Sequence, residues 1–131
     1  MTVHIAQLDG RHATAAELAP LAFAGYAHFT AAQVRDGRIR GLDLHLDRLR
    51  DASEYFFGRA LPDDRVGGYL RAALDASPAD VSLTATVFSR PGEFVAADDA
   101  LSVLVRTGPP ASGPTGRWRW RPWNTSVRWP G

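Results

Sequence analysis

The sequence predicts a domain that mixes short strands with helices, and three local patterns carry this prediction. Asp36-Gly37 separates two stretches of strand-forming residues. This dipeptide is the strongest short-range hairpin signal in the chain, because a type I′ turn needs a positive φ at both central residues. Apolar residues recur at helical spacing between Leu42 and Phe56. Residues 81–88 alternate between apolar and polar side chains, which is typical of a half-buried strand.

The composition excludes several kinds of protein. A chain of 131 residues has the length of one domain, and its 45% hydrophobic content supplies a core. The absence of Cys excludes disulfides, thiol nucleophiles and thiolate metal sites. Residues 1–7 contain neither a basic region nor a long apolar run. We therefore expect no secretion signal, no membrane span and a cytoplasmic protein.

The first third of the chain is expected to form a strand, a helix and a hairpin. Residues 3–8 can form a short strand that ends at the turn Asp9-Gly10. Thr14, followed by Glu17 three residues later, has the spacing of a capping box, which predicts a helix over 15–23. The hairpin would then pair 28–34 with 38–40.

Two helices and two strands are expected to follow. Asp43 can cap the first helix and Gly58 can end it. Its predicted buried stripe consists of Leu42, Leu46, Leu49, Ala52 or Ser53, and Phe56. A second helix starts at Pro62 or Asp63 and ends at Ser77-Pro78, with an apolar face of Val66, Tyr69, Leu70, Ala73 and Leu74. Strands are expected at 81–88 and 101–105, joined by a loop over 91–99.

The basic residues are unusual in kind and in distribution. All 15 are Arg, so the chain contains no lysine. Residues 117–131 contain four Arg and no acid, whereas residues 1–116 contain eleven Arg and fourteen acids and carry a charge of −3. A guanidinium stays protonated and is no nucleophile, so none of these side chains can form an imine.

Residues 25–58 resemble a known family of enzymes. The segment reads GYAHFTAAQVRDGRIRGLDLHLDRLRDASEYFFG, which is strand, tight turn, strand, and a helix that begins with His-Leu-Asp-Arg-Leu. This order resembles the start of the class IV, or fold type IV, pyridoxal-phosphate-dependent aminotransferases. The family includes branched-chain and D-amino-acid aminotransferases and aminodeoxychorismate lyase. With Leu8-Asp9-Gly10-Arg11, the resemblance covers 7–107.

The resemblance implies the fold class and the division of the chain. The fold would be α+β, a small two-layer domain whose helices pack on a largely antiparallel sheet. The family-like domain would cover 1–108. A linker rich in Gly and Pro would follow at 109–116, and a basic, Trp-rich tail would cover 117–131.

The resemblance also implies a role for Arg48. In the family, the Arg of the His-Leu-x-Arg-Leu motif faces the cofactor and binds its phosphate. Arg suits this task because its planar, permanently charged guanidinium can hold a phosphate through two parallel hydrogen bonds. The alternative, from spacing alone, is a surface Arg paired with Asp51 or Glu54.

Four residues of the hairpin strand are implied to line the substrate side of the pocket: His28, Phe29, Thr30 and Gln33. Alternation along the strand places His28 and Thr30 on one face and Phe29 and Ala31 on the other. The alternative is a plain hairpin with one core face.

The remaining residues point to no catalytic group. His45 could be a general base, but no Ser, Cys or metal-ligand partner is visible, and a structural role at the helix start is favoured. The four His show no spacing of paired metal ligands. Arg117 to Arg121 alternates like a strand with Trp118 and Trp120 on one face. We interpret it as a strand that packs on a partner domain rather than as a nucleic-acid surface.

The functional expectation combines the resemblance with the missing lysine. The family's second domain would carry the Schiff-base lysine, the Glu at the pyridine nitrogen and further phosphate-binding groups. We expect a truncated N-terminal domain whose parent catalyses amino-group transfer, or the related lyase reaction, on a small amino acid. Alone it would be inactive and would hold no stable pyridoxal phosphate. It could form a homodimer. The alternative is a non-catalytic interaction module that pairs with an intact homologue.

Overall fold

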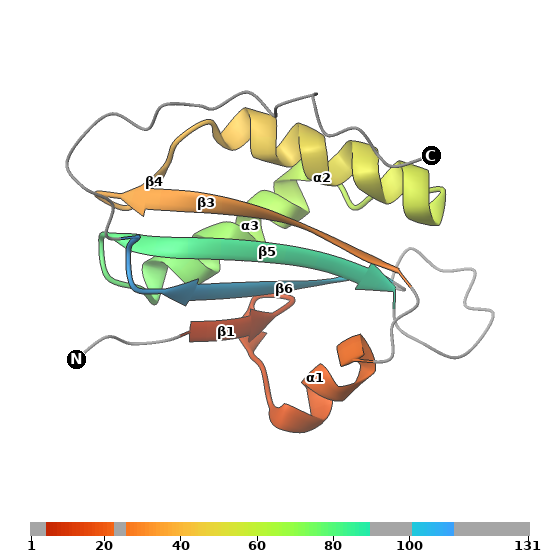
Figure 1. The fold of residues 1–131 in the computed structure, drawn as a ribbon, viewed down its shortest axis with the longest axis horizontal. Helices are drawn as coiled ribbons and strands as arrows, with labels where there is room; N and C mark the ends of the chain where they lie inside the picture. Colours follow the sequence, from red (N-terminus) through yellow and green to blue (C-terminus); the bar gives the residue numbers. More distant parts are fainter. Residues whose placement is uncertain (1–4, 23–25, 90–100, 112–131) are drawn as a thin grey trace, which may run out of the picture.

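The computed structural model describes residues 5–22, 26–89 and 101–111, and these form an antiparallel sheet with packed helices (Figure 1). In chain order the elements are β1 (Ile5–Leu8), β2 (Arg11–His12), α1 (Ala15–Ala22), β3 (Ala27–Arg35), β4 (Arg38–Ile39), α2 (Leu42–Phe57), α3 (Asp63–Asp75), β5 (Val81–Ser89) and β6 (Leu101–Gly108). The strand order is β2-β1-β6-β5-β3-β4, with every pair antiparallel. The predicted α+β class is confirmed.

Two Asp-Gly dipeptides make the tight turns of the sheet. Asp36 and Gly37 both have positive φ, at 54° and 70°, so the predicted hairpin turn between β3 and β4 is confirmed. Asp9 and Gly10 repeat this geometry, with φ of 50° and 82°, between β1 and β2. Strand β2 has only two residues, too few for alternation to reveal it in the sequence.

The three long strands form the centre of the sheet. β5 pairs with β3 on one side and with β6 on the other, with Ala85 opposite both Thr30 and Val105. Val81, Leu83 and Val87 alternate on β5 as the sequence predicts, and each is at most 2% exposed. They face the main core under α2 and α3.

Helices α2 and α3 cover one face of the sheet. Leu49 and Ser53 are buried in α2, as predicted, but Leu42 and Phe56 are 38% and 43% exposed. The buried stripe is therefore shorter than predicted, because α2 packs mainly on β3, near the edge of the sheet, which leaves Leu42 and Phe56 partly uncovered. Phe57 packs on the core at the C-terminal end.

Helix α1 packs on the opposite face, where it forms a smaller cluster. Leu18 and Leu21 pack there against Leu8, Phe88 and Leu104. The predicted capping box is present, because the Glu17 amide donates to Thr14 Oγ1 and the Thr14 amide donates to Glu17 Oε1, both over 3.3 Å.

The start of α2 differs from the prediction. Its N-cap is Gly41, with φ of 70° and no side-chain hydrogen bond, so the prediction that Asp43 caps the helix is wrong. The turn out of β4 needs the left-handed conformation at Gly41, which starts the helix one residue before Asp43. Gly58 ends α2 as predicted, with φ of 72° and its amide bonded to the Glu54 carbonyl over 2.9 Å.

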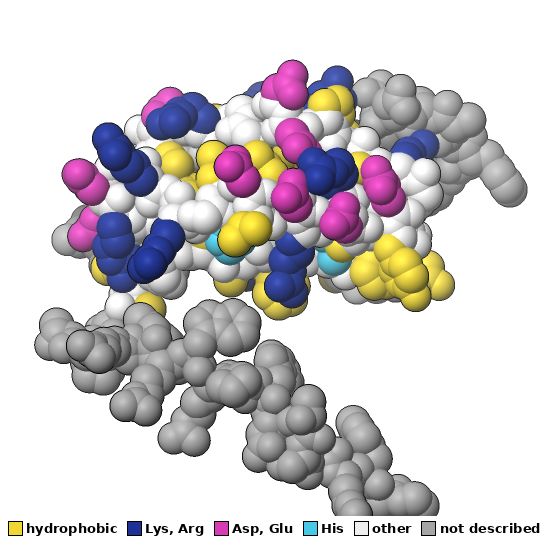
Figure 2. Space-filling model, turned by 90° about the horizontal axis from the view of Figure 1, so that it is seen from above, with side chains coloured by type: hydrophobic (Ala, Val, Ile, Leu, Met, Phe, Trp, Pro, Cys, Tyr) yellow, Lys and Arg dark blue, Asp and Glu magenta, His cyan; other side chains and the backbone are white. Residues whose placement is uncertain are grey.

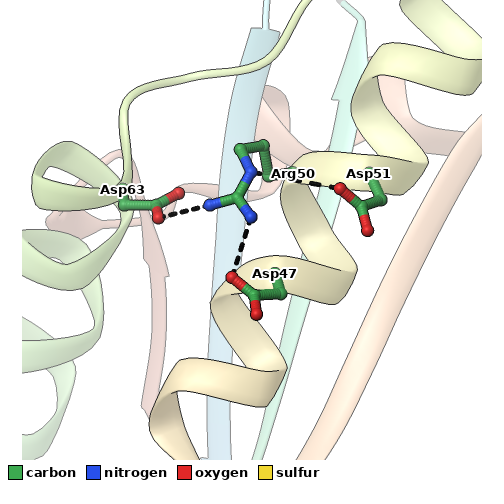
Figure 3. Close-up of polar contacts among 4 residues, drawn as sticks. All are labelled: Asp47, Arg50, Asp51 and Asp63. Carbon is green, nitrogen blue, oxygen red and sulfur yellow. Dashed lines mark hydrogen bonds and ion pairs between the residues drawn. The ribbon is translucent and has the colours of Figure 1, made fainter.

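Arg50 joins α2 to the start of α3 (Figure 3). Its Nη1 lies 2.6 Å from Asp63 Oδ2, its Nη2 lies 2.8 Å from Asp47 Oδ1, and its Nε lies 4.0 Å from Asp51. The hydrogen bond to Asp47, followed by the charges of Asp63, Asp47 and Asp51, raises the pKa of Arg50. The cluster is exposed to solvent, so its main effect is to orient the two helices.

Two leucines of α2 test this packing. Leu49→Ala should lower the free energy of unfolding by about 2–5 kcal/mol, because it empties a buried site. Leu44 is 74% exposed, and Leu44→Ala should change that free energy by about 0.5 kcal/mol or less. Chemical denaturation measures both. Equal losses would contradict the placement of α2.

Candidate functional site

An open groove lies where the start of α2 faces β3. It has a volume of about 870 Å³. The residues that line it are Phe29, Thr30, Ala31, Arg40, Gly41, Leu44, His45 and Arg48. The groove thus brings together the hairpin strand, the turn after β4 and the first two turns of α2.

Arg48 enters this groove with an unpaired guanidinium. Its side chain is exposed, while the next residue, Leu49, anchors the helix in the core. Within the described residues Arg48 makes no ion pair and no hydrogen bond, so the alternative pairing with Asp51 or Glu54 is not formed. Asp51 instead lies beside Arg50.

His45 and Thr30 connect α2 to β3 at the floor of the groove. His45 Nδ1 lies 2.7 Å from Thr30 Oγ1, and Thr30 is only 5% exposed. The bond satisfies the buried hydroxyl and fixes the start of a helix that lacks a side-chain cap. This contact is of the kind expected of a structural His at the helix start.

His28 and Ser53 make a second connection further along α2. His28 Nε2 lies 2.8 Å from Ser53 Oγ, and Ser53 is 3% exposed. The imidazole stacks on Phe56 and tilts against Phe57, with ring centroids 6.1 Å and 5.8 Å away. Burial, and then the positive charge of Arg48, lower the pKa of His28.

The four predicted substrate-side residues do not gather in one place. Thr30 and Phe29 line the groove with Arg48, and Phe29 is 59% exposed. His28 faces α2 and is bonded to Ser53. Gln33 lies at the other end of β3, where its amide contacts Ser82 and accepts from the Ala111 amide. The alternation of the strand is confirmed, and a contact of these residues with substrate stays a prediction.

Arg40 and Leu44 are among the groove residues that were not predicted as site residues. Arg40 follows β4 and adds a second guanidinium to the lining. Leu44 is 74% exposed and presents an apolar side chain at the rim. The sequence could have predicted that Leu44 is exposed, because it falls outside the helical spacing of Leu42, Leu46 and Leu49.

The surface around α2 is acidic and ends in an aromatic patch. Figure 2 shows acidic side chains along the helix layer and a hydrophobic patch at the end where α2 terminates. The exposed aromatic residues there are Tyr26, Tyr55 and Phe56, at 65%, 84% and 43%. Phe56 stacks on Tyr26 and meets Tyr55 edge to face. The groove with its two Arg side chains is therefore distinct in charge from the outer face of α2.

The groove fits the phosphate of a cofactor but not its covalent attachment. Arg40 and Arg48 offer two guanidinium groups, which match phosphate oxygens. The sequence contains no lysine, so no side chain of this chain can form an imine. In the described part of the chain no three His, Asp or Glu side chains gather as metal ligands. Among the described helices, none has the length and apolar character needed to cross a membrane.

Comparison with known proteins identifies the family. The profile of the amino-transferase class IV family matches residues 27–130, which include most of the chain. The chain therefore belongs to the class IV amino-transferase family. No curated protein matches it.

A solved structure shares the fold. The 4-amino-4-deoxychorismate lyase from Pseudomonas aeruginosa superposes with a TM-score of 0.62 at 23% sequence identity. The match covers 84% of this chain and 42% of the lyase chain. The chain thus spans less than half the length of the solved structure that it matches.

The free energy of unfolding should decrease as the pH is lowered, and His28 is one cause of this decrease. Its pKa in the folded state lies below the ordinary value of 6.5, so the unfolded chain binds more protons in that range. This contribution is complete above about pH 6.5 and is lost as the pH falls through the folded pKa. Chemical denaturation at pH 7 and at pH 5 measures this effect. Between these two pH values the free energy of unfolding should decrease less for His28→Gln than for the native chain.

The exposed His12 supplies the control for this measurement. His12→Gln should keep the native pH dependence. If His28→Gln also kept it, His28 would not be the group that couples protonation to unfolding.

Proposed function

We propose that this chain forms the phosphate-binding, N-terminal part of a class IV pyridoxal-phosphate enzyme, with Arg48 as the residue that binds the phosphate. The observation that carries the proposal is the unpaired guanidinium of Arg48, a residue of α2, in the groove at which the same helix begins. The family membership of the chain and its fold support this assignment.

The local charge of the groove favours a phosphate for three reasons. Arg48 can form two charge-assisted hydrogen bonds with its oxygens. Arg40 adds a second positive charge. Gly41 lines the groove and leaves the first amides of α2 without a side-chain cap, and free amides at a helix N-terminus favour an anion.

The hydrogen bonds under the groove would position Arg48 for this task. His45 bonds to Thr30 one turn before Arg48, and Ser53 bonds to His28 one and a half turns after it. Both bonds hold α2 against β3, so the position of Arg48 on the helix is fixed relative to the strand. This lowers the ordering cost of binding.

The complete reaction would need groups from outside these 131 residues. Pyridoxal phosphate, when bound, supplies an electron sink that stabilises a carbanion on the substrate. The amine that anchors it must come from another chain or domain, because this chain has no lysine. We propose amino-group transfer, or the related lyase reaction, on a small amino acid as the activity of the complete site, with a second copy or an intact homologue as the partner.

Two arginines of α2 test the phosphate site. The chain should bind pyridoxal 5′-phosphate weakly and reversibly, and inorganic phosphate should compete. Arg48→Gln should weaken binding roughly tenfold to hundredfold, because a charge-assisted hydrogen bond contributes about 1.5–3 kcal/mol. NMR titration of the labelled chain measures the affinity, and pyridoxal without phosphate serves as the ligand control.

Arg50→Gln is the matched control, since Arg50 lies on the same helix but faces Asp63 and Asp47. It should keep the phosphate affinity within about twofold of the native chain. A similar loss in both variants would mean that binding follows the overall charge of α2. Unchanged binding in Arg48→Gln would refute the assignment.

The missing lysine gives a second test. The chain has one primary amine, at its N-terminus, and Arg does not replace a nucleophilic amine. We expect no stoichiometric adduct after incubation with pyridoxal phosphate and borohydride reduction, and no amino-transfer activity. Intact-mass spectrometry and peptide mapping check this. A single adduct at one position, together with turnover, would overturn the expectation.

A further inference from the structure

A second groove lies on the other side of the α2 start, away from Arg48. It runs between the β3–β4 hairpin and α3 and has a volume of about 280 Å³. No residue lines both this groove and the groove at Arg48. Its volume is close to the lower end of the range for small-molecule sites, about 300–1,000 Å³. We refer to it as the hairpin groove.

The floor of the hairpin groove is apolar. Leu70 is 3% exposed and belongs to the main core, and Ile39 and Leu74 pack beside it. Leu42, at the first residue of α2, also lines the groove and is 38% exposed. The exposed position of Leu42, which interrupts the predicted stripe, therefore adds apolar surface to this floor.

The walls of the hairpin groove are basic. Arg38 comes from β4 and Arg71 from α3, and both side chains are exposed. Unlike Arg50, neither forms an ion pair or a hydrogen bond with any described residue. Among the described residues that line the groove there is no acid. Figure 2 shows several basic side chains, with acidic ones beside them, at the end of the molecule where the hairpin lies.

Gly67 keeps the hairpin groove open on the side of α3. Glycine weakens a helix interior, and a Cβ built at Gly67 would meet no atom within 4 Å. The packing of the described residues therefore does not require a glycine there. Any larger side chain at position 67 would instead extend into the groove, which Gly67 lines.

We propose that the hairpin groove binds a small organic carboxylate with an apolar body. The carboxylate accepts hydrogen bonds from the guanidinium groups of Arg38 and Arg71, which lie on two different walls. The apolar body lies over Leu70 and covers Ile39 and Leu42, whose exposed surface it removes from water. The ligand is a carboxylate rather than a cation because no acid lines the groove.

Octanoate is the probe for this proposal, and the labelled chain is titrated with it by NMR. Saturable shifts are expected at the amides of Gly37 and Gly67, which line the groove. Arg38→Gln and Arg71→Gln should each weaken binding about tenfold. Gly67→Leu should weaken it at least tenfold by filling the groove.

Gly68→Leu is the matched control, because Gly68 lies in the same helix but outside the groove and a Cβ there also meets no atom within 4 Å. It should leave the octanoate affinity within twofold of the native chain. Both substitutions replace a helical glycine by a better helix former, so both variants are expected to fold.

Three further probes distinguish other occupants. If octanol bound as tightly as octanoate, the charge of the ligand would play no part in binding. If inorganic phosphate bound as tightly as octanoate, the apolar body of the ligand would play no part. Shifts at Gly37 and Gly67 that grow with protein concentration, without added probe, would assign the groove to a second copy of the chain. Each of these results, or an unchanged affinity in Gly67→Leu, would overturn the proposal.

Discussion

The packing of α2 on β3 is the contact on which the rest of the structure depends. Leu49, which is 2% exposed, inserts into the core from the middle of α2. The pairs His45–Thr30 and His28–Ser53 lie before and after it along the helix. The buried Leu49, supported by Leu46 and Phe57, and the two hydrogen bonds therefore fix both the translation and the rotation of α2. The groove at Arg48 exists because this rotation places Leu49 inward and its neighbour Arg48 outward.

Local sequence signals predicted the elements well where the chain itself sets the geometry. Asp36-Gly37, the Thr14–Glu17 capping box and Gly58 each specify a backbone conformation with a few residues, and all three are present. The helical period predicted Leu49 as buried but also Leu42 and Phe56, which are exposed. Periodicity gives the direction of a side chain on its helix, whereas burial depends on where the sheet ends.

The candidate site was predictable in part for the same reason. The motif placed Arg48 on the flank of α2, and the structure leaves its guanidinium unpaired at a groove. The partners of His45 and His28 could not be read from the sequence, because each bond joins α2 to β3 across 15 or 25 residues. The sequence also did not reveal that, among the described residues, Arg50 is paired with acidic residues while Arg48 is not. Both are charged residues of one helix turn, but in the described part of the chain Arg50 alone is paired, with Asp47 and Asp51 on its own helix and with Asp63 on α3.

The strands at the two edges of the sheet set how this protein can associate. β2 and β4 have two residues each, and each edge strand begins with an exposed Arg. β4 pairs only with Val34 and Arg35 of β3, so among the described residues the outer edge of β3 over 27–33 has no strand neighbour. The short, charged β4 therefore protects only the hairpin end of this edge. Backbone pairing with a further strand is available along this stretch of β3, whereas the faces of the sheet and the helices associate through side chains.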